Sequence, residues 1–315
     1  MHLIHRFCPH APLAGARMGK LWRARLTAWV AAASCASALA AGPATTGSPP
    51  AAASVPASAT AAAQGPRVLR NLAYGTEARQ QLDAYVPARP AGPVLVMVHG
   101  GAWVLGDKAE PGMIQPKAAY WTQQGYVVVS VNYRLVPKVR PHEQAEDVAR
   151  ALAFVQREAA SWGADGRRVV LMGHSAGGHL VALLHANPAE AQRVGAHPWK
   201  GTVVLDSAAL DLVSLMRAPH PRLYDRAFGT DPAYWERVSP FHAMQPKGPP
   251  PVLFICSQQR PDACPQADAY ERKASEFKHR VTIWMQDKDH MQINRQLGQP
   301  GIYTDSVARW ISSIL

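Results

Sequence analysis

The sequence is poor in cysteine and in the residue spacings that bind metals. Its 315 residues include four cysteines, and it contains neither a CxxC pair nor an HExxH pattern. Structural zinc sites typically have ligands at such short, paired spacings. The thirteen histidines do not combine with the cysteines in this way. We therefore expect no metal site.

Acidic residues are missing from the first 66 positions, where five of the 33 Lys and Arg residues lie. The formal net charge of +11 therefore falls to +6 for the remainder, which has 28 basic and 22 acidic residues. These basic residues are scattered and form no stripe, whereas nucleic-acid-binding domains concentrate them on one face. We expect no nucleic-acid partner, and oligomeric state is not indicated.

The sequence also lacks an apolar run long enough for a stable membrane span. The longest candidate, LTAWVAAASCASALA at 26–40, has about 15 residues, whereas a spanning helix needs roughly 20. Basic residues precede this run and Ala38-Leu39-Ala40 ends it, which is typical of a secretory signal peptide. We expect a signal peptide over 1–41 and export to the periplasm or medium. Met18 is an alternative start, and Cys35 an alternative lipid-anchoring site.

Residues 42–66 are rich in Ala, Pro and Ser, without charge and almost without large apolar side chains. Such a tract cannot bury enough surface to offset the entropy lost on ordering. We expect a flexible linker there, followed by one folded domain over 67–315. A domain of about 250 residues can bury roughly three-quarters of its unfolded surface around one core.

Apolar runs alternate with helical patterns through this domain. Runs that are apolar on both faces are typical of parallel strands covered by helices. Six occur, at 93–100, 126–133, 168–175, 201–207, 250–257 and 280–287, after a more amphipathic hairpin over 70–87. Between two of them, 142–163 carries apolar residues at spacings of three and four, and Gly163 ends the pattern. The sequence predicts an α/β fold, a mostly parallel sheet with helices on both faces and a short cap over 208–249.

The segment GHSAGG, residues 173–178, follows one apolar strand and precedes a helical pattern. A serine in a sharp strand-to-helix turn is held outward in a strained conformation, and the flanking glycines let strand and helix approach. The context makes Ser175 a candidate nucleophile. His174 is adjacent, but consecutive side chains diverge at such a turn, so we expect it to shape the pocket wall instead of acting as the base.

A second glycine-rich segment, HGGAW at 99–103, ends an earlier strand. Glycines let main-chain N–H groups turn toward a developing oxyanion without interference from a Cβ atom. We expect Gly100, Gly101 and the N–H of Ala176 to form an oxyanion hole.

Together HGGAW, SVNYRLVP (130–137) and GHSAGG resemble the α/β-hydrolase superfamily, in its HGG-containing esterase and lipase (carboxylesterase-like) branch. The resemblance covers about 70–315. It implies a triad in the chain order serine, acid, histidine, an acyl-enzyme mechanism on a small-molecule ester, and no cofactor. This sequence departs from the commoner pattern at Ala102, where glycine is usual, and at Met291 after the histidine.

Two residues match the remaining triad positions. Asp262 follows the strand 250–257, and His290 follows the last strand. We favour Asp262 as the acid because its strand neighbours that of the histidine. Asp206 and Asp211, which follow an earlier strand, are the alternatives. Asp287 and Asp289 are too local to His290 to orient it and are expected at the surface.

Other side chains are candidates for structural or binding roles. We expect Cys256 and Cys264, which bracket Asp262, either to form a disulfide or to be separate thiols. The expected pocket-lining residues are Trp103, His174, Tyr224 and Trp235.

Three functions remain open on these patterns. The first is an exported carboxylic-ester hydrolase acting on a small, aryl or short-acyl ester. The second is an amide hydrolase of the aryl-formamidase type on the same triad, and the third a non-catalytic binding module. The excursion over 208–249 is expected to set the substrate, since long connections commonly carry function.

Overall fold

The computed structural model describes residues 66–315. The predicted signal peptide (1–41), with Met18 and Cys35, lies outside the described residues, as does all of the predicted linker except its last residue. Within the described part of the chain, no helix has the length and hydrophobicity needed to cross a membrane.

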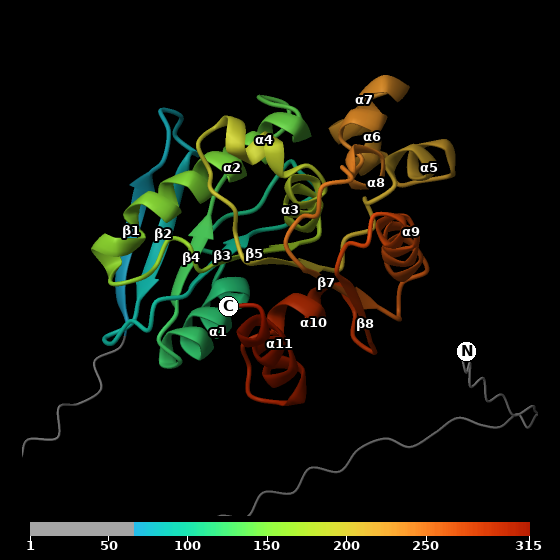
Figure 1. Cartoon of the computed structure of the whole chain (residues 1–315). Helices are drawn as coiled ribbons and strands as arrows, with labels where there is room; N and C mark the ends of the chain where they lie inside the picture. Colours follow the sequence, from blue (N-terminus) through green and yellow to red (C-terminus); the bar gives the residue numbers. More distant parts are fainter. Residues whose placement is uncertain (1–65) are drawn as a thin grey trace, which may run out of the picture. The chain divides into compact units, whose positions relative to one another are not determined.

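Residues 66–315 fold around a sheet of eight strands in the order β1-β2-β4-β3-β5-β6-β7-β8 (Figure 1). Strands β1 and β2 form the expected antiparallel hairpin, β2 pairs antiparallel with β4, and the other pairs are parallel. The strands are β1 (Arg67–Ala73), β2 (Gln81–Val86), β3 (Val94–Val98), β4 (Val127–Val131), β5 (Val169–His174), β6 (Gly201–Leu205), β7 (Val252–Ser257) and β8 (Val281–Gln286). The predicted α/β fold is confirmed.

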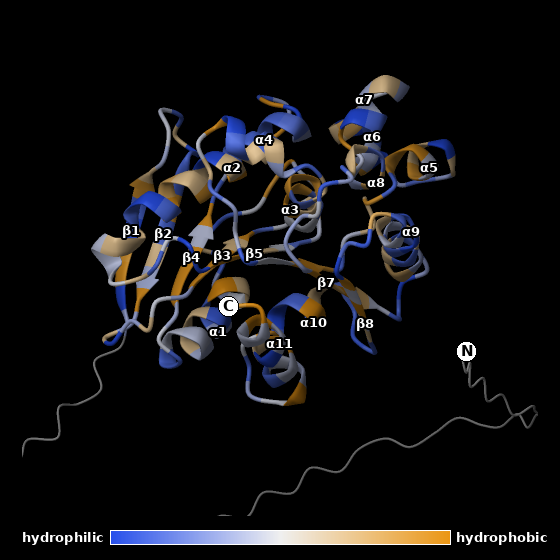
Figure 2. Cartoon of the chain, in the orientation of Figure 1, coloured by the Kyte–Doolittle hydropathy of each residue, from blue (hydrophilic) through white to orange (hydrophobic). Residues whose placement is uncertain are grey.

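The central strands are buried on both faces, which explains their continuous apolar sequences. In the ladder, Val96 of β3 lies between Val129 of β4 and Leu171 of β5, and all three side chains are buried. Helices cover the two faces (Figure 1). One face is covered by α2 (Pro141–Glu158), α3 (Ala176–Ala186) and α9 (Ala263–Glu276), and the other by α1 (Pro111–Gln123), α10 (His290–Arg295) and α11 (Ile302–Ser313). Figure 2 shows hydrophobic colours on β7 and α3 and hydrophilic colours on α9.

Helix α2 shows how local sequence sets these boundaries. Pro141 occupies the first turn, where its missing N–H costs nothing. Glu143 reaches back to accept the backbone N–H of Arg140 at 3.0 Å. A short 3₁₀ turn over Ala159–Trp162 follows, and Gly163 ends it at a φ of 75°, a left-handed conformation that favours glycine.

The excursion after β6 contains four short helices and a part of the cavity wall. These are α5 (Leu212–Arg217), α6 (Arg222–Phe228), α7 (Pro232–Arg237) and α8 (Pro240–Ala243). The remaining helix, α4 (Pro188–Arg193), follows α3 directly. Because α6 contributes Leu223 and Tyr224 to the cavity that contains Ser175, described below, the excursion over 208–249 lies where a substrate-contacting segment is expected.

A buried lysine ties α1 to α10. The Lys117 side chain is fully buried, and its Nζ donates to the carbonyl oxygens of Met113, at 2.9 Å, and Asn294, at 2.6 Å. Burial lowers the pKa of Lys117 to about 7, because the charged ammonium loses its hydration. In this way α1 holds the short helix that begins at His290.

This buried amine predicts a pH dependence of stability. Between the folded pKa of Lys117, about 7, and the ordinary value near 10.5, the unfolded chain binds more protons than the folded one. Stability from this group therefore rises with pH across that window, by at most about 1.4 kcal/mol per pH unit. Urea unfolding at pH 7, 8 and 9 should show a steeper rise for the wild type than for Lys117→Met. Parallel curves would contradict this assignment.

Candidate active site

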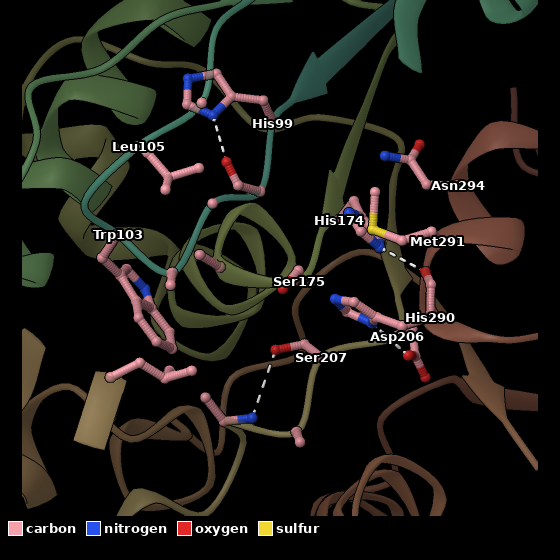
Figure 3. A pocket seen from close by; sticks show the side chains of 18 of the residues that line it. His99, Trp103, Leu105, His174, Ser175, Asp206, Ser207, His290, Met291 and Asn294 are labelled. Atoms are coloured by element: carbon pink, nitrogen blue, oxygen red, sulfur yellow. Dashed lines mark hydrogen bonds and ion pairs between the residues drawn. The ribbon is translucent and has the colours of Figure 1, made fainter. Parts of the chain in front are cut away.

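A cavity of about 670 Å³ lies at the carboxyl ends of the parallel strands, the edge at which open α/β sheets bind ligands. The segments that follow β3, β5, β6, β7 and β8 all contribute to its lining. Five strands thus deliver side chains to one place, although these residues lie far apart in the sequence (Figure 3).

Ser175 occupies the turn between β5 and α3 and lines this cavity. Its φ of 55° and ψ of −118° are a strained combination for a residue with a side chain. The turn is possible because its neighbours lack side chains. A Cβ atom on Gly177 would overlap the carbonyl oxygens of Val98 and His99, and one on Gly173 would overlap Gly177. The predicted strand-turn-helix arrangement around the serine is present.

His290 begins α10 and pairs with Asp206, the first residue after β6. Its Nδ1 lies 2.6 Å from Asp206 Oδ2. An ionised carboxylate only accepts hydrogen bonds, so Nδ1 carries the proton of a neutral ring and Nε2 is left as an acceptor. In Figure 3 the His290 ring lies between Ser175 and Asp206. This is the orientation that a base acting on the serine needs.

Asp206 is itself fixed by its surroundings. Its side chain is fully buried, its φ is 49°, and its Oδ1 accepts the backbone N–H of Ser257 at 2.7 Å. Burial alone would raise the pKa of Asp206. The hydrogen bonds from His290 and Ser257, with the charge of Arg260, outweigh burial and lower that pKa. The carboxylate therefore stays charged beside the imidazole.

The prediction that Asp262 pairs with His290 is wrong in this structure. The carboxylate of Asp262 receives Nη2 of Arg260 at 2.9 Å, and Arg260, not Asp262, reaches His290 Nδ1. The physical reason lies in the turn. Asp262 is already the N-cap residue of α9, so the side chain that the loop after β7 directs at the histidine comes from two residues earlier. Asp206, the alternative, holds the position beside the ring.

The other aspartates are placed elsewhere. Asp211 caps α5 by accepting the N–H of Ser214 at 3.1 Å. Asp289 caps α10 by accepting the N–H groups of the two residues that follow His290. Asp287 accepts a hydrogen bond from Gln259 at 2.9 Å. Neither Asp287 nor Asp289 orients the histidine, as expected from their closeness to it in the sequence.

The loop after β3 has an unusual backbone. Gly101, Ala102 and Trp103 have φ values of 120°, 51° and 64°, three consecutive residues in the left-handed region that favours glycine. A Cβ atom on Gly100 would lie 3.0 Å from Ser175 Cβ, so this loop abuts the serine. Gly100, Gly101 and Ala176 all line the cavity beside Ser175.

Side chains from other elements hold this loop. Tyr133 stacks on the His99 ring, with centroids 4.4 Å apart, and its hydroxyl donates to the His99 carbonyl at 3.0 Å. Gln144 of α2 donates to the Trp103 carbonyl at 2.8 Å. The indole N–H of Trp103 donates to His179 Nδ1 at 3.1 Å, and His179 Nε2 lies 2.7 Å from the carbonyl of Val238. The strained backbone is therefore supported from two sides.

His174 lines the cavity, but its hydrogen bonding does not suit a general base. Its Nε2 lies 2.9 Å from the backbone carbonyl of His290, an acceptor, so Nε2 must be the donor. Burial, with the nearby His290 as a smaller cause, lowers the pKa of His174 to about 3. A neutral ring that donates to the His290 backbone supports the start of α10.

Among the expected pocket residues, Trp103 and Tyr224 line the cavity, whereas Trp235 does not. The indole N–H of Trp235 donates to the carbonyl of Gly229 at 3.1 Å, which fixes it within the excursion. That expectation was wrong because α6, and not α7, faces the cavity. Sequence analysis also missed Leu105 and Leu223, which line the cavity although 60 % and 41 % exposed. Their exposure depends on tertiary structure, and no local sequence pattern indicates it.

Two further side-chain pairs are present. Of the two alternatives expected for Cys256 and Cys264, the structure has the disulfide, which joins β7 to α9 and closes the loop that carries Arg260 and Asp262. Arg134 and Asp147 form an ion pair, with Nη2 and Oδ1 2.7 Å apart.

Known proteins resemble this chain in sequence and in fold. The BD-FAE family model matches residues 82–261. A probable isoprenylcysteine alpha-carbonyl methylesterase ICMEL1 of Oryza sativa is 35% identical over 137 residues, 42% of this chain and 32% of that protein. Esterase LipC of Mycobacterium tuberculosis is 38% identical over 120 residues, 36% of this chain and 28% of the relative. The chain thus spans about a third of the length of such curated relatives.

Solved structures share the fold. Esterase B from Lactobacillus Rhamnosis superimposes with a TM-score of 0.64 at 21% identity, over 80% of this chain and 86% of that one. A carbohydrate esterase from gut microbiota gives 0.66 at 17% identity, over 79% and 99%. At such identities the likeness concerns the fold alone. The BD-FAE family model matches more than half of the residues of this chain. The chain is therefore a member of the BD-FAE family, and it has the α/β-hydrolase fold.

Proposed function

We propose that the protein is a serine carboxylic-ester hydrolase with Ser175 as nucleophile, His290 as base and Asp206 as the acid. The observation that carries this proposal is the His290–Asp206 pair, 2.6 Å apart, in one cavity with a serine on a strained strand-to-helix turn. A binding module has no need for this strain and this buried carboxylate, and the names of the relatives, methylesterase and esterase, support the same reading.

The proposed mechanism follows from the donors and acceptors. His290 Nε2 accepts the proton of Ser175 as its oxygen attacks the ester carbonyl, and Asp206 stabilises the resulting imidazolium. N–H groups of the Gly100–Gly101 loop and of Ala176 stabilise the tetrahedral oxyanion, each by roughly 3–4 kcal/mol. His290 then protonates the departing alcohol, and a water molecule repeats the sequence on the acyl-enzyme.

The cavity supports a small, aryl or short-acyl ester as substrate. Its volume of about 670 Å³ fits the range of sites for small ligands. Part of its lining is made of large apolar and aromatic side chains, namely Trp103, Leu105, Leu223, Tyr224 and Met291. Export belongs to the same proposal, and what supports it is the sequence pattern of residues 1–41.

The distinction between ester and amide chemistry predicts a measurable preference. We expect p-nitrophenyl butyrate to be hydrolysed far faster than the matched p-nitroanilide, because nitrophenoxide leaves without a proton, whereas the anilide nitrogen must be protonated as its C–N bond breaks. Steady-state kcat/KM for the two substrates tests this expectation. Preference for the anilide would favour the amide-hydrolase alternative, and failure to hydrolyse either substrate would contradict the proposed function.

A further inference from the structure

Arg260 places a positive charge directly beside the histidine of the proposed triad. It lies on the loop between β7 and α9. Its Nη1 is 2.9 Å from Asp206 Oδ2 and 2.8 Å from His290 Nδ1, and its Nη2 is 2.9 Å from Asp262 Oδ2. The guanidinium therefore bridges two carboxylates while one of its nitrogens touches the imidazole.

The contact between Arg260 and His290 Nδ1 cannot be a hydrogen bond in the competent tautomer. Nδ1 has one in-plane position, and its proton is directed there at Asp206. An Arg260 N–H could donate to Nδ1 only if the proton moved to Nε2, and Nε2 could then no longer accept the proton of Ser175. The positive charge of Arg260 therefore disfavours protonation of the His290 ring. Arg260 also holds Asp206, and Asp206 keeps the ring in its orientation.

The charges around His290 pull in opposite directions. Asp206 favours the imidazolium that forms during the reaction, and Arg260, at a similar distance, disfavours it. The side chain of Arg260 is held by Asp262, and the disulfide between Cys256 and Cys264 spans the same loop. Arg260 is therefore a fixed part of the site.

The remaining titratable and charged groups near His290 come from its own segment, from β5, α1, α6 and α11. They include Lys288 and Asp289 before it, Arg295 of the same helix, His174 of β5, the buried Lys117 of α1, Tyr224 of α6 and Tyr303 of α11. Two charged side chains contact Nδ1 of the His290 ring, namely Asp206 and Arg260.

We propose that Arg260 is a positioning residue that lowers the basicity of His290 and thereby extends the activity of the enzyme to lower pH. The inference rests on the proposed function for its consequence in activity, but the charge effect on the ring can be measured without turnover. A general base acts only while neutral. A cation in contact with the imidazole keeps the ring neutral at pH values at which it would otherwise be protonated.

The first test measures the titration of His290 by NMR in protein that does not turn over. Ser175→Ala is compared with Ser175→Ala/Arg260→Met, and the resonance is assigned by its loss in Ser175→Ala/His290→Gln. We expect Arg260→Met to raise the protonation midpoint of His290 by about one pH unit, and Arg260→Lys, which keeps the charge, to change it less.

The direction of the shift separates this role from a merely structural one. If Arg260 served only to hold Asp206, its removal would loosen the carboxylate, and the midpoint of His290 would fall. An unchanged or lower midpoint in a variant with the circular dichroism spectrum of its parent would therefore overturn the proposal. Arg260→Gln, a second neutral variant, serves if Arg260→Met does not fold.

The second test follows activity against pH in protein with Ser175 intact. The acidic limb of kcat/KM for p-nitrophenyl butyrate should move up by about one pH unit in Arg260→Met. A limb that stays in place would contradict the inference and leave the proposed function standing. The proposed function fails separately, if Ser175→Ala retains the activity of the wild type.

Discussion

Asp206→Asn is expected to lower kcat for an aryl ester by about 10⁴-fold, while Asp262→Asn retains activity within about tenfold of the wild type. The reason is geometric. Asp206 Oδ2 lies 2.6 Å from His290 Nδ1, whereas the carboxylate of Asp262 receives Arg260. An asparagine at 206 presents an amide that can donate to Nδ1 and so hold the tautomer whose Nε2 cannot accept the serine proton.

The control for this pair of variants is stability. Asp206 also accepts the N–H of Ser257, so thermal unfolding must show that Asp206→Asn is folded at the assay temperature. Steady-state kinetics of both variants at several pH values then gives the comparison. An inactive Asp262→Asn together with an active Asp206→Asn would reinstate the acid favoured by the sequence and contradict the geometry.

Ser175→Ala is expected to reduce kcat by about 10⁶-fold with little change in thermal stability, since the substitution removes one oxygen from a strained turn. A matched control is Ser207→Ala. Ser207 lines the same cavity (Figure 3), and its Oγ accepts the backbone N–H of Ala209 at 3.5 Å. We expect that variant to lose less than about tenfold, because peripheral contacts contribute less than the nucleophile.

Measurement of kcat for both serine variants with the same p-nitrophenyl ester distinguishes loss of the nucleophile from a change elsewhere in the cavity wall. Equal losses in the two variants would show that neither serine is specially activated. Near-wild-type turnover by Ser175→Ala would place the nucleophile elsewhere.

The fold could be predicted because each buried strand has its own apolar sequence pattern. Strands β3 to β7 lie inside the sheet, with helices on both faces, so each is a continuous apolar run that is visible without knowledge of its neighbours. The turn at Ser175 was equally local, because the glycines that permit it stand within two residues. The predicted helix over 142–163 is α2 followed by the 3₁₀ turn, and that turn ends where Gly163 adopts a left-handed conformation.

The acid could not be chosen with the same certainty because the choice depends on three segments at once. Asp262 follows β7, which neighbours β8, and Asp206 follows β6, one strand further away. The deciding fact is that the loop after β7 directs Arg260 at the ring, with Asp262 as its anchor. The spacing of 28 residues between Asp262 and His290 does not indicate that Arg260 contacts the ring. It does not indicate the left-handed backbone at Asp206 either.

The cavity wall was also beyond local patterns. Aromatic residues of the excursion over 208–249 are alike in sequence, but Tyr224 on α6 faces the cavity and Trp235 on α7 does not. Which of the short helices turns inward depends on their packing against α3 and against each other, and that packing is set by the whole domain.

Reaction with a fluorophosphonate, followed by intact-mass and peptide mass spectrometry, tests whether Ser175 is the nucleophile activated by His290. Such a probe traps an activated serine as a stable phosphonyl ester. We expect a single adduct on Ser175, formed much more slowly in His290→Gln and in Asp206→Asn. An adduct on another residue, or equal rates of labelling in wild type and His290→Gln, would contradict it.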